Sequence, residues 1–190
     1  KASERVLRAY SIASSPNQRG EIEFCVKRIE GGVASNYIWN LQVGQTVELT
    51  GTFGHFFYKQ DPHIEQIFLI GTGTGVAPLK SMFTFALESG EKRPIHLLFG
   101  EREIKDFYYL QELASFKEKY PNFNFTLCAS REAGEGFYSG RVTQALATLF
   151  PLSKKTSFYL CGGQAMLTDV KAFLVTHNVS AGNVYLEKFF

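Results

Sequence analysis

Residues 67–79 read IFLIGTGTGVAPL, and this stretch decides the fold. The four apolar residues at 67–70 predict a short buried strand, and a helix is expected from about residue 77. Glycines at 71, 73 and 75 lie between them. Glycine permits a tight turn, and a helix N-terminus that follows suits an anion such as a pyrophosphate. The spacing differs from Gly-x-Gly-x-x-Gly, so the stretch alone fits a βα turn without a ligand equally well.

The composition indicates a globular protein. The chain has 190 residues, with 45% hydrophobic and 20% charged residues, enough for one large domain or two small ones. A formal net charge of +2 gives no electrostatic case for binding nucleic acid or a membrane surface. No apolar run approaches the ~20 residues that a membrane span requires, so no span is predicted.

The cysteines and histidines argue against disulfides and metals. Cys25, Cys128 and Cys161 are odd in number and far apart, which favours neither a disulfide framework nor a local iron–sulfur site. We therefore expect a reducing, cytoplasmic setting. The four histidines show no metal-ligand spacing, and no metal site is predicted.

The first third of the chain predicts β structure. Alternating or short apolar segments predict strands at 8–14, 21–28 and 45–51, with a small helix at 35–41. Short strands separated by turn residues predict part of an antiparallel β-barrel. Near residues 61–63 the pattern changes, which divides the chain into residues 1–62 and 63–190.

The second part alternates strands and helices, as in a parallel α/β sheet. Strands are expected at 67–70, 95–99, 123–129, 157–161 and 183–187. Helices are expected at about 77–88, 107–119, 139–149 and 164–176. The predicted fold class is therefore α/β, with a partial antiparallel barrel preceding a parallel-sheet nucleotide-binding domain.

Several residues lie where a ligand could be held, each beside a plain structural alternative. Arg8, Tyr10 and Ser11 can bind phosphate, stack on a ring and form hydrogen bonds, or they form an ordinary edge strand. Ser35 can be a helix N-cap or part of an anion site. Cys161 ends an apolar strand at the edge where open α/β sheets bind ligands, although a buried cysteine is often a small hydrophobe. Ser130 with Arg131 can bind a phosphomonoester or lie in a solvated loop.

Taken in order, these motifs resemble the ferredoxin–NADP(+) reductase superfamily of flavoproteins. The similar segments are Arg8-Ala9-Tyr10-Ser11, Cys25-Val26-Lys27, Gly32-Val33-Ala34-Ser35-Asn36, Gly51-Thr52-Phe53-Gly54, residues 71–78, Phe99-Gly100-Glu101-Arg102, Cys161-Gly162-Gly163 with Met166, and Glu187-Lys188-Phe189. Each motif is weak alone, but eight in order span nearly the whole chain.

The resemblance implies an FAD-binding barrel over residues 1–62 and an NAD(P)-binding domain over residues 63–190. Catalytic roles would fall to Ser11 near flavin N5, Cys161 near the nicotinamide and Glu187 near the flavin edge. The implied cofactor-binding residues are Arg8, Tyr10, Ser11, Cys25, Val26, Lys27, Gly32, Val33, Ala34, Ser35, Gly73, Thr74, Gly75, Ser130, Arg131, Arg141, Cys161, Gly162 and Phe189.

Within that family the implied activity is hydride transfer between NAD(P)H and FAD, with electrons passed to a ferredoxin or flavodoxin type of protein or to another acceptor. Ser130 and Arg131, assisted by Arg141, favour NADP, and NAD is possible. The alternatives are an NADH-using reductase component of a multicomponent oxygenase and a non-catalytic nucleotide-binding module. Family barrels have about two or three strands before the Arg-x-Tyr-Ser motif, where this sequence has seven residues, so we expect an incomplete barrel.

Overall fold

A computed structural model describes residues 7–189 of the chain, and its dominant feature is a parallel sheet flanked by helices. The strands are β1 Gln66–Thr72, β2 Ile95–Glu101, β3 Phe123–Ala129, β4 Phe137–Ser139, β5 Thr156–Gly162 and β6 Val184–Lys188. The α-helices are α1 Val33–Trp39, α2 Val76–Glu88, α3 Leu110–Lys119, α4 Val142–Leu149 and α5 Gln164–Thr176. Short 3-10 turns are η1 Gly73–Gly75, η2 Ile104–Asp106 and η3 Ala181–Asn183.

The strand order shows where a ligand belongs. The six strands follow the order β4-β3-β2-β1-β5-β6, and every neighbouring pair is parallel. The chain runs outward from β1 to one edge and then returns to place β5 on the other side of β1. In open sheets of this kind, ligands bind beyond the carboxyl ends of the strands where the order reverses. That position here is between β1 and β5.

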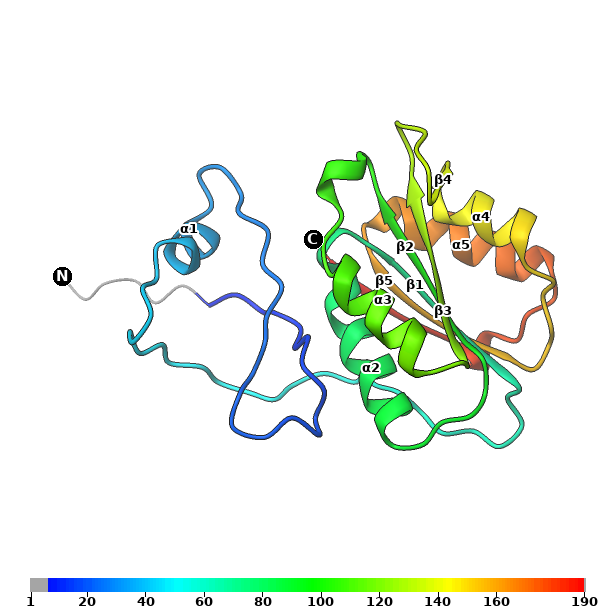
Figure 1. Cartoon of the computed structure of the whole chain (residues 1–190), viewed down its shortest axis with the longest axis horizontal. Coiled ribbons are helices and arrows are strands. Elements are labelled where there is room, and N and C mark those ends of the chain that lie inside the picture. The colour runs from blue at the N-terminus through cyan, green and yellow to red at the C-terminus, as the bar shows by residue number, and fades with distance from the viewer. Residues whose placement is uncertain (1–6, 190) are drawn as a thin grey trace.

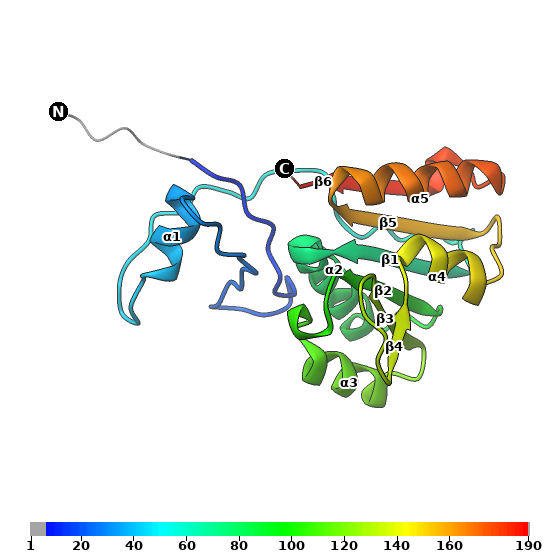
Figure 2. The ribbon, with the colours of Figure 1, turned by 90° about the horizontal axis from the view of Figure 1, so that it is seen from above.

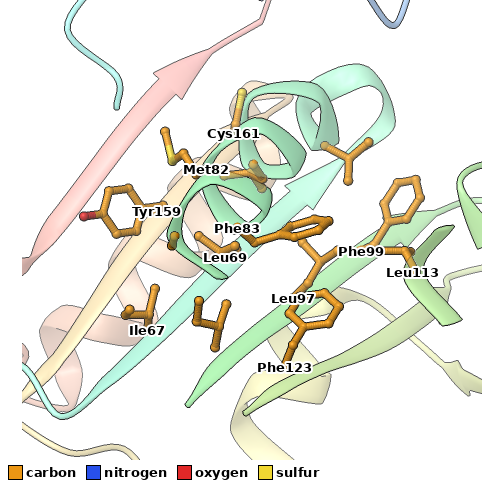
Figure 3. Packing of buried hydrophobic residues seen from close by; sticks show 14 of the residues in the cluster. Ile67, Leu69, Met82, Phe83, Leu97, Phe99, Leu113, Phe123, Tyr159 and Cys161 are labelled. Atoms are coloured by element: carbon orange, nitrogen blue, oxygen red, sulfur yellow. The ribbon is translucent and has the colours of Figure 1, made fainter. Parts of the chain in front are cut away.

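Helices cover both faces of the sheet (Figures 1 and 2), and an apolar cluster on each face holds them there. On one face α2 and α3 pack over side chains that alternate along β1 and β2, including Ile67, Leu69 and Leu97. Figure 3 shows this cluster. The Phe83 ring of α2 packs on the Phe123 ring of β3, with the ring centroids 4.7 Å apart. On the other face α4 and α5 cover the intervening side chains, such as Phe68 and Ile70. Burial on both faces explains why these strands read as continuous apolar runs.

The predicted α/β class and its parallel sheet are confirmed. All five predicted strands and all four predicted helices of the second part are present, with ends shifted by a few residues. The largest shifts are at the starts of α3 and α4, which begin at Leu110 rather than 107 and at Val142 rather than 139. In α3 the start is delayed because η2 and an extended residue precede it. The three-residue strand β4 was not predicted, since it is too short to show a period.

The strands predicted at 8–14, 21–28 and 45–51 are wrong as paired strands. Among the described residues of this part, pairing is limited to one antiparallel bridge between Ile12 and Phe24, beside the hydrogen bond from Ala13 N to Glu23 O (2.8 Å). The alternating pattern gives an extended backbone, but a ladder forms only where a second strand meets it in register.

The small helix is present, but Ser35 is not its N-cap. Helix α1 begins at Val33, and Gly32 is the N-cap residue. Ser35 instead lies in the first turn, where its Oγ accepts the Ile29 N–H at 3.1 Å. The hydroxyl therefore holds the preceding loop against the helix rather than capping an amide of its own helix.

Residues 7–189 contain neither a membrane-spanning helix nor a cluster of metal ligands. No helix there is long and apolar enough to cross a lipid bilayer. The same part of the chain contains no group of three or more His, Cys, Asp or Glu side chains placed to hold a metal ion.

Candidate functional site

The site begins at the glycine turn that joins β1 to α2. Gly73 has φ +55, a left-handed conformation that favours glycine, and a Cβ there would meet nothing within 4 Å. Gly75 faces inward, because a Cβ at this position would lie 2.3 Å from the Cys161 carbonyl oxygen. The turn thus packs its third glycine against the end of β5 and leaves its middle open to a ligand.

The end of β5, like the turn at 73–75, has one crowded glycine and one open glycine. Gly162 has φ +149, and a Cβ there would lie 2.3 Å from Thr72 Oγ1. A Cβ on Gly163 would meet nothing within 4 Å. Helix α5 starts immediately afterwards, as α2 does after the turn at 73–75. Two helix N-termini with unpaired amides therefore flank the open glycines between β1 and β5, which is an arrangement suited to an anion.

Ser11, Cys161 and Glu187 meet beside these turns. Cys161 and Glu187 are register partners on β5 and β6, and the thiol sulfur lies 4.0 Å from Glu187 Oε2. Ser11 Oγ donates to the same carboxylate oxygen at 3.0 Å, across 176 residues of sequence. The three residues named as catalytic by resemblance thus form one cluster, which joins the first part of the chain to the sheet.

Cys161 is a poor nucleophile. Burial, followed by the charge of Glu187, raises the pKa of its thiol. The thiol is completely buried and therefore stays protonated at neutral pH. Its role in this cluster is that of a small neutral side chain beside the open glycines.

The chain terminus is tied to the same place. Phe189 N–H donates to the Gly162 carbonyl oxygen at 3.1 Å, which extends the pairing of β6 with β5 by one residue. The Phe189 side chain packs against the cluster on the α2 face. An aromatic ring is thereby held next to the turn at 162–163.

The other residues of the first part are more open. Arg8 is exposed, and its guanidinium donates to the Leu7 carbonyl oxygen at 2.8 Å. Tyr10 and Cys25 are half-buried, whereas Lys27 is exposed. Of the remaining predicted flavin residues, Val26, Gly32 and Ala34 are half-buried and Val33 is exposed.

Ser130 and Arg131 lie two strands away from β1, directly after β3. Both are exposed, and their backbone N–H groups donate to the Glu101 and Arg102 carbonyl oxygens at 3.0 Å. Arg141 precedes α4 and lies 3.5 Å from Asp169 on α5. These residues are therefore apart from the Ser11 cluster, on the side of the glycine turn toward β2 and β3.

Sequence reasoning missed four residues that lie where the two parts meet. Tyr108 OH donates to the Gly73 carbonyl oxygen at 2.6 Å, and Tyr109 OH donates to Glu23 Oε1 at 2.5 Å. Lys80 of α2 lies 2.6 Å from Glu23 Oε2. A signal was present for Lys80, because it falls in the apolar stripe of Val76, Phe83 and Leu87, where a charge requires a partner.

Glu101, at the end of β2, is also perturbed. Burial raises the pKa of its carboxyl to about 7, although the nearby Lys27 acts in the opposite direction. Tyr108 and Cys25 face the same region, and burial raises the pKa of both. The contact between the first part and the sheet is therefore a partly desolvated environment.

These residues fit a dinucleotide. The open glycines at 73 and 163 and the two helix N-termini can take a pyrophosphate, and the Ser11 cluster lies at one end of that cradle. Figure 2 shows residues 7–60 beside the end of the sheet at which the C-terminus lies, so a second cofactor held by those residues would reach the same cluster.

Comparison with known proteins gives the same assignment. The profile of the oxidoreductase NAD-binding domain matches residues 69–172, and that of the oxidoreductase FAD-binding domain matches residues 1–58. The reductase component of the naphthalene 1,2-dioxygenase/salicylate 5-hydroxylase systems of a Ralstonia species is 33% identical, over 97% of this chain and 56% of its own length. The reductase component of propane 2-monooxygenase from Mycolicibacterium goodii is 33% identical, over 96% and 54%.

Solved structures agree in fold. The Amycolatopsis cytochrome P450 reductase GcoB superposes with a TM-score of 0.86 at 33% identity, over 95% of this chain and 55% of its own. A ferredoxin NADP+ reductase from Neisseria gonorrhoeae has the same TM-score at 22% identity, over 96% and 80%, which shows the shared fold. The chain spans about half the length of the curated relatives it matches. It belongs to the ferredoxin–NADP(+) reductase superfamily, with an FAD-binding domain followed by an NAD-binding domain.

Proposed function

We propose that this chain binds FAD and NAD(P)H and catalyses hydride transfer between them, passing the electrons to a further acceptor. The observation that carries the proposal is the meeting of Ser11, Cys161 and Glu187 at the β1/β5 switch point. One of these residues comes from the FAD-binding part, and two come from the NAD-binding part. The division into residues 1–62 and 63–190 is part of the same proposal.

For hydride transfer, the main task of the protein is to orient the nicotinamide and the flavin. Bound FAD and nicotinamide would supply the hydride acceptor and donor. The chain positions them, excludes water and controls one proton, which Ser11 Oγ holds in its hydrogen bond to Glu187. The neutral Cys161 thiol beside Glu187 adds no second charge to the site. A general base with a shifted pKa is not needed.

NADP is the proposed preferred nucleotide. Ser130 and Arg131 are exposed at the end of β3, where an arginine can form a charge-assisted pair with a ribose 2′-phosphate. Arg131→Ala should therefore raise the KM for NADPH by about 10-fold or more and leave that for NADH unchanged. Arg19→Ala, at an exposed turn of the first part, is the control. Equal KM values for the two nucleotides in the unmodified chain would contradict the preference.

The acceptor is proposed as a redox protein of ferredoxin or flavodoxin type, or a small molecule. The names of the Ralstonia and Mycolicibacterium relatives favour one version, a reductase component of a multicomponent oxygenase. Cys25, Cys128 and Cys161 are all free, which suits a reducing compartment such as the cytoplasm.

Two measurements on the 190-residue chain test the proposal. FAD is titrated into the purified protein and followed by quenching of flavin fluorescence, and NADPH is then added anaerobically while the flavin absorption is recorded. The proposal expects saturable FAD binding and bleaching by NADPH. A chain that takes up nucleotide but neither binds FAD nor bleaches it would instead be a non-catalytic nucleotide-binding module.

A further inference from the structure

Lys80 is the most completely enclosed charged side chain at the contact between the FAD-binding part and the sheet. Its side chain is 9% exposed and it lies on α2, five residues after Gly75. The Nζ atom lies 2.6 Å from Glu23 Oε2 and 2.9 Å from Glu112 Oε2. It also lies 4.4 Å from the centre of the Tyr109 ring.

The other oxygen of Glu23 is also occupied. Tyr109 OH donates to Glu23 Oε1 at 2.5 Å. Burial alone would raise the pKa of Glu23, but the hydrogen bonds from Lys80 and Tyr109 outweigh it, and the net pKa is lowered. Glu23 is thus held as a carboxylate between a cation of α2 and a hydroxyl at the start of α3.

We propose that Lys80, with Glu23, Tyr109 and Glu112, forms a charged joint around the buried lysine ammonium that sets the position of Ser11 relative to the glycine turn, which makes Lys80 a positioning residue for hydride transfer. The kinetic consequence rests on the proposed function, whereas the joint itself does not. We call these four residues the Lys80 joint.

The route from Glu23 to Ser11 is short. Glu23 O accepts the Ala13 N–H at 2.8 Å, and Glu23 N donates to Ser14 Oγ at 3.1 Å. Ile12 bridges Phe24 next to them. A shift of Glu23 therefore moves residues 12–14, and with them Ser11, whose hydroxyl reaches Glu187.

Helix α2 makes further contacts with the same segment. Ser81 Oγ donates to the Ser14 carbonyl oxygen at 2.7 Å, and Ser15 Oγ donates to Glu88 Oε2 at 2.9 Å. Because α2 follows directly from the turn at 73–75, the helix links that turn to the segment carrying Ser11. Tyr108 adds a link at the other side through its hydrogen bond to the Gly73 carbonyl oxygen.

The backbone of Tyr109 adopts an unfavourable conformation, which is consistent with this role. Its φ is +61, in the left-handed region that bulky residues rarely adopt. Such conformations are unfavourable and persist only where the surroundings fix them. Here the conformation places the Tyr109 ring over Lys80 and its hydroxyl on Glu23.

Stability alone does not account for a buried lysine at this position. A buried ion pair is often no more stabilising than apolar side chains of the same size, whereas its directional contacts fix one geometry. Lys80 projects from the apolar stripe of α2, where methionine would pack on the same neighbours. What methionine lacks is the pair of directional contacts to Glu23 and Glu112.

The test uses Lys80→Met, with Lys80→Arg as the conservative variant and Lys155→Met as the matched control. Lys155 pairs with Glu65 at 2.5 Å, but both side chains are more than 60% exposed, and they lie at the opposite end of the sheet, just before β5 and β1. Hydrogen exchange of the chain without added cofactors gives the first readout. Lys80→Met should speed exchange in residues 11–25, Lys80→Arg should restore slower exchange, and Lys155→Met should match the unmodified chain.

The second readout is anaerobic flavin reduction at increasing NADPH concentration. Lys80→Met should lower the saturating rate by about 10- to 100-fold and leave the dissociation constant of NADPH unchanged, because small misplacements of reacting groups have effects of that size. Glu23→Gln, which keeps the shape of the side chain, should give the same split if Lys80→Met does not fold.

The possible outcomes distinguish three claims: the joint itself, its positioning role and the proposed function. Unchanged exchange in residues 11–25 for both Lys80→Met and Glu23→Gln, or an equal increase for Lys155→Met, would overturn the joint. Faster exchange with an unchanged saturating rate would overturn the positioning role. An unmodified chain whose bound FAD is not reduced by NADPH would refute the proposed function, while the exchange experiment would still decide the joint.

Discussion

At the scale of single residues, Ser11 is the most informative side chain. The sequence motif predicted its importance, and the structure places its hydroxyl 3.0 Å from Glu187 Oε2. A motif cannot show such a contact between residues 176 positions apart in the sequence. The motifs therefore single out these residues as candidates, whereas their convergence depends on the fold.

The first prediction concerns this hydroxyl. Ser11→Ala should lower the saturating rate of flavin reduction by about 10- to 100-fold, because a hydrogen bond to a charged group contributes about 1.5–3 kcal/mol. NADPH binding should be unaffected, since its cradle lies at the glycine turns. Ser115→Ala, which loses only an exposed bond to the Gln111 carbonyl oxygen, is the control. An unchanged rate in Ser11→Ala would remove the proposed role.

The second prediction at this scale concerns pH and stability. Burial, followed by the charge of Lys117, lowers the pKa of His96 to about 4. The unfolded chain has the ordinary histidine pKa of about 6.5, so it binds a proton in a range where the folded protein does not. Because of this residue, the free energy of unfolding should therefore decrease by up to about 3 kcal/mol as the pH falls from neutrality to 4.

Chemical unfolding at pH 7 and at pH 4.5 measures this effect. His96→Gln removes the titrating ring and should reduce the difference in unfolding free energy between the two pH values. His177→Gln, at an exposed position after α5, is the control. A pH dependence that is the same in His96→Gln and the unmodified protein would show that His96 does not contribute.

At the scale of elements, the glycine turn between β1 and α2 combines two different requirements. Gly73 is open and needs its positive φ, whereas Gly75 is glycine because the end of β5 leaves no room for a side chain. The regular spacing of the three glycines in the sequence does not distinguish these two roles.

The third prediction separates them. Gly75→Ala places a methyl group against the Cys161 carbonyl and should destabilise the protein by about 1–3 kcal/mol or more, the usual cost of overpacking. Gly163→Ala, where a Cβ meets nothing within 4 Å and φ is −68, should leave stability nearly unchanged. Thermal unfolding of the two variants compares them directly. Equal melting temperatures would contradict the close approach of β1 and β5.

The elements also show why some of the fold could not be predicted. Runs such as residues 67–70 predict buried strands because apolar helices cover both faces of the sheet. The segments at 21–28 and 45–51 alternate clearly, and the segment at 8–14 reads as a short strand, yet among them they form only the bridge between Ile12 and Phe24. Alternation reports which side of a strand is apolar and contains no information about a pairing partner. The sequence likewise did not predict the Lys80 joint, because its members come from distant segments of the chain.

At the scale of the whole molecule, the two parts differ in how well they are packed. The sheet part has two continuous apolar clusters. In contrast, large apolar side chains of the first part are exposed, including Trp39 at 64% and Phe53 at 85%. Few buried contacts and few backbone hydrogen bonds are the marks of a region of low local stability. A ligand that contacts this part should therefore change its stability most.

The fourth prediction follows from this contrast. Limited proteolysis of the chain should cut first within residues 40–57 and leave a resistant fragment that contains β1 to β6. Saturating FAD should slow those first cuts and leave later cuts within the sheet unaffected. First cuts within the sheet part, between β1 and β6, would contradict the division of the chain at residues 61–63. First cuts that FAD does not slow would contradict the binding of FAD by the first part.

The most direct test of the central claim is the anaerobic visible spectrum of the chain loaded with FAD, recorded as NADPH is added. The fifth prediction is that NADPH bleaches the flavin band in a single phase, and that deuterium at the transferred position of nicotinamide C4 slows this phase by a primary isotope effect. Such a result would show that the chain transfers a hydride from nicotinamide C4 to its bound FAD. A flavin band that NADPH leaves unchanged would contradict the account.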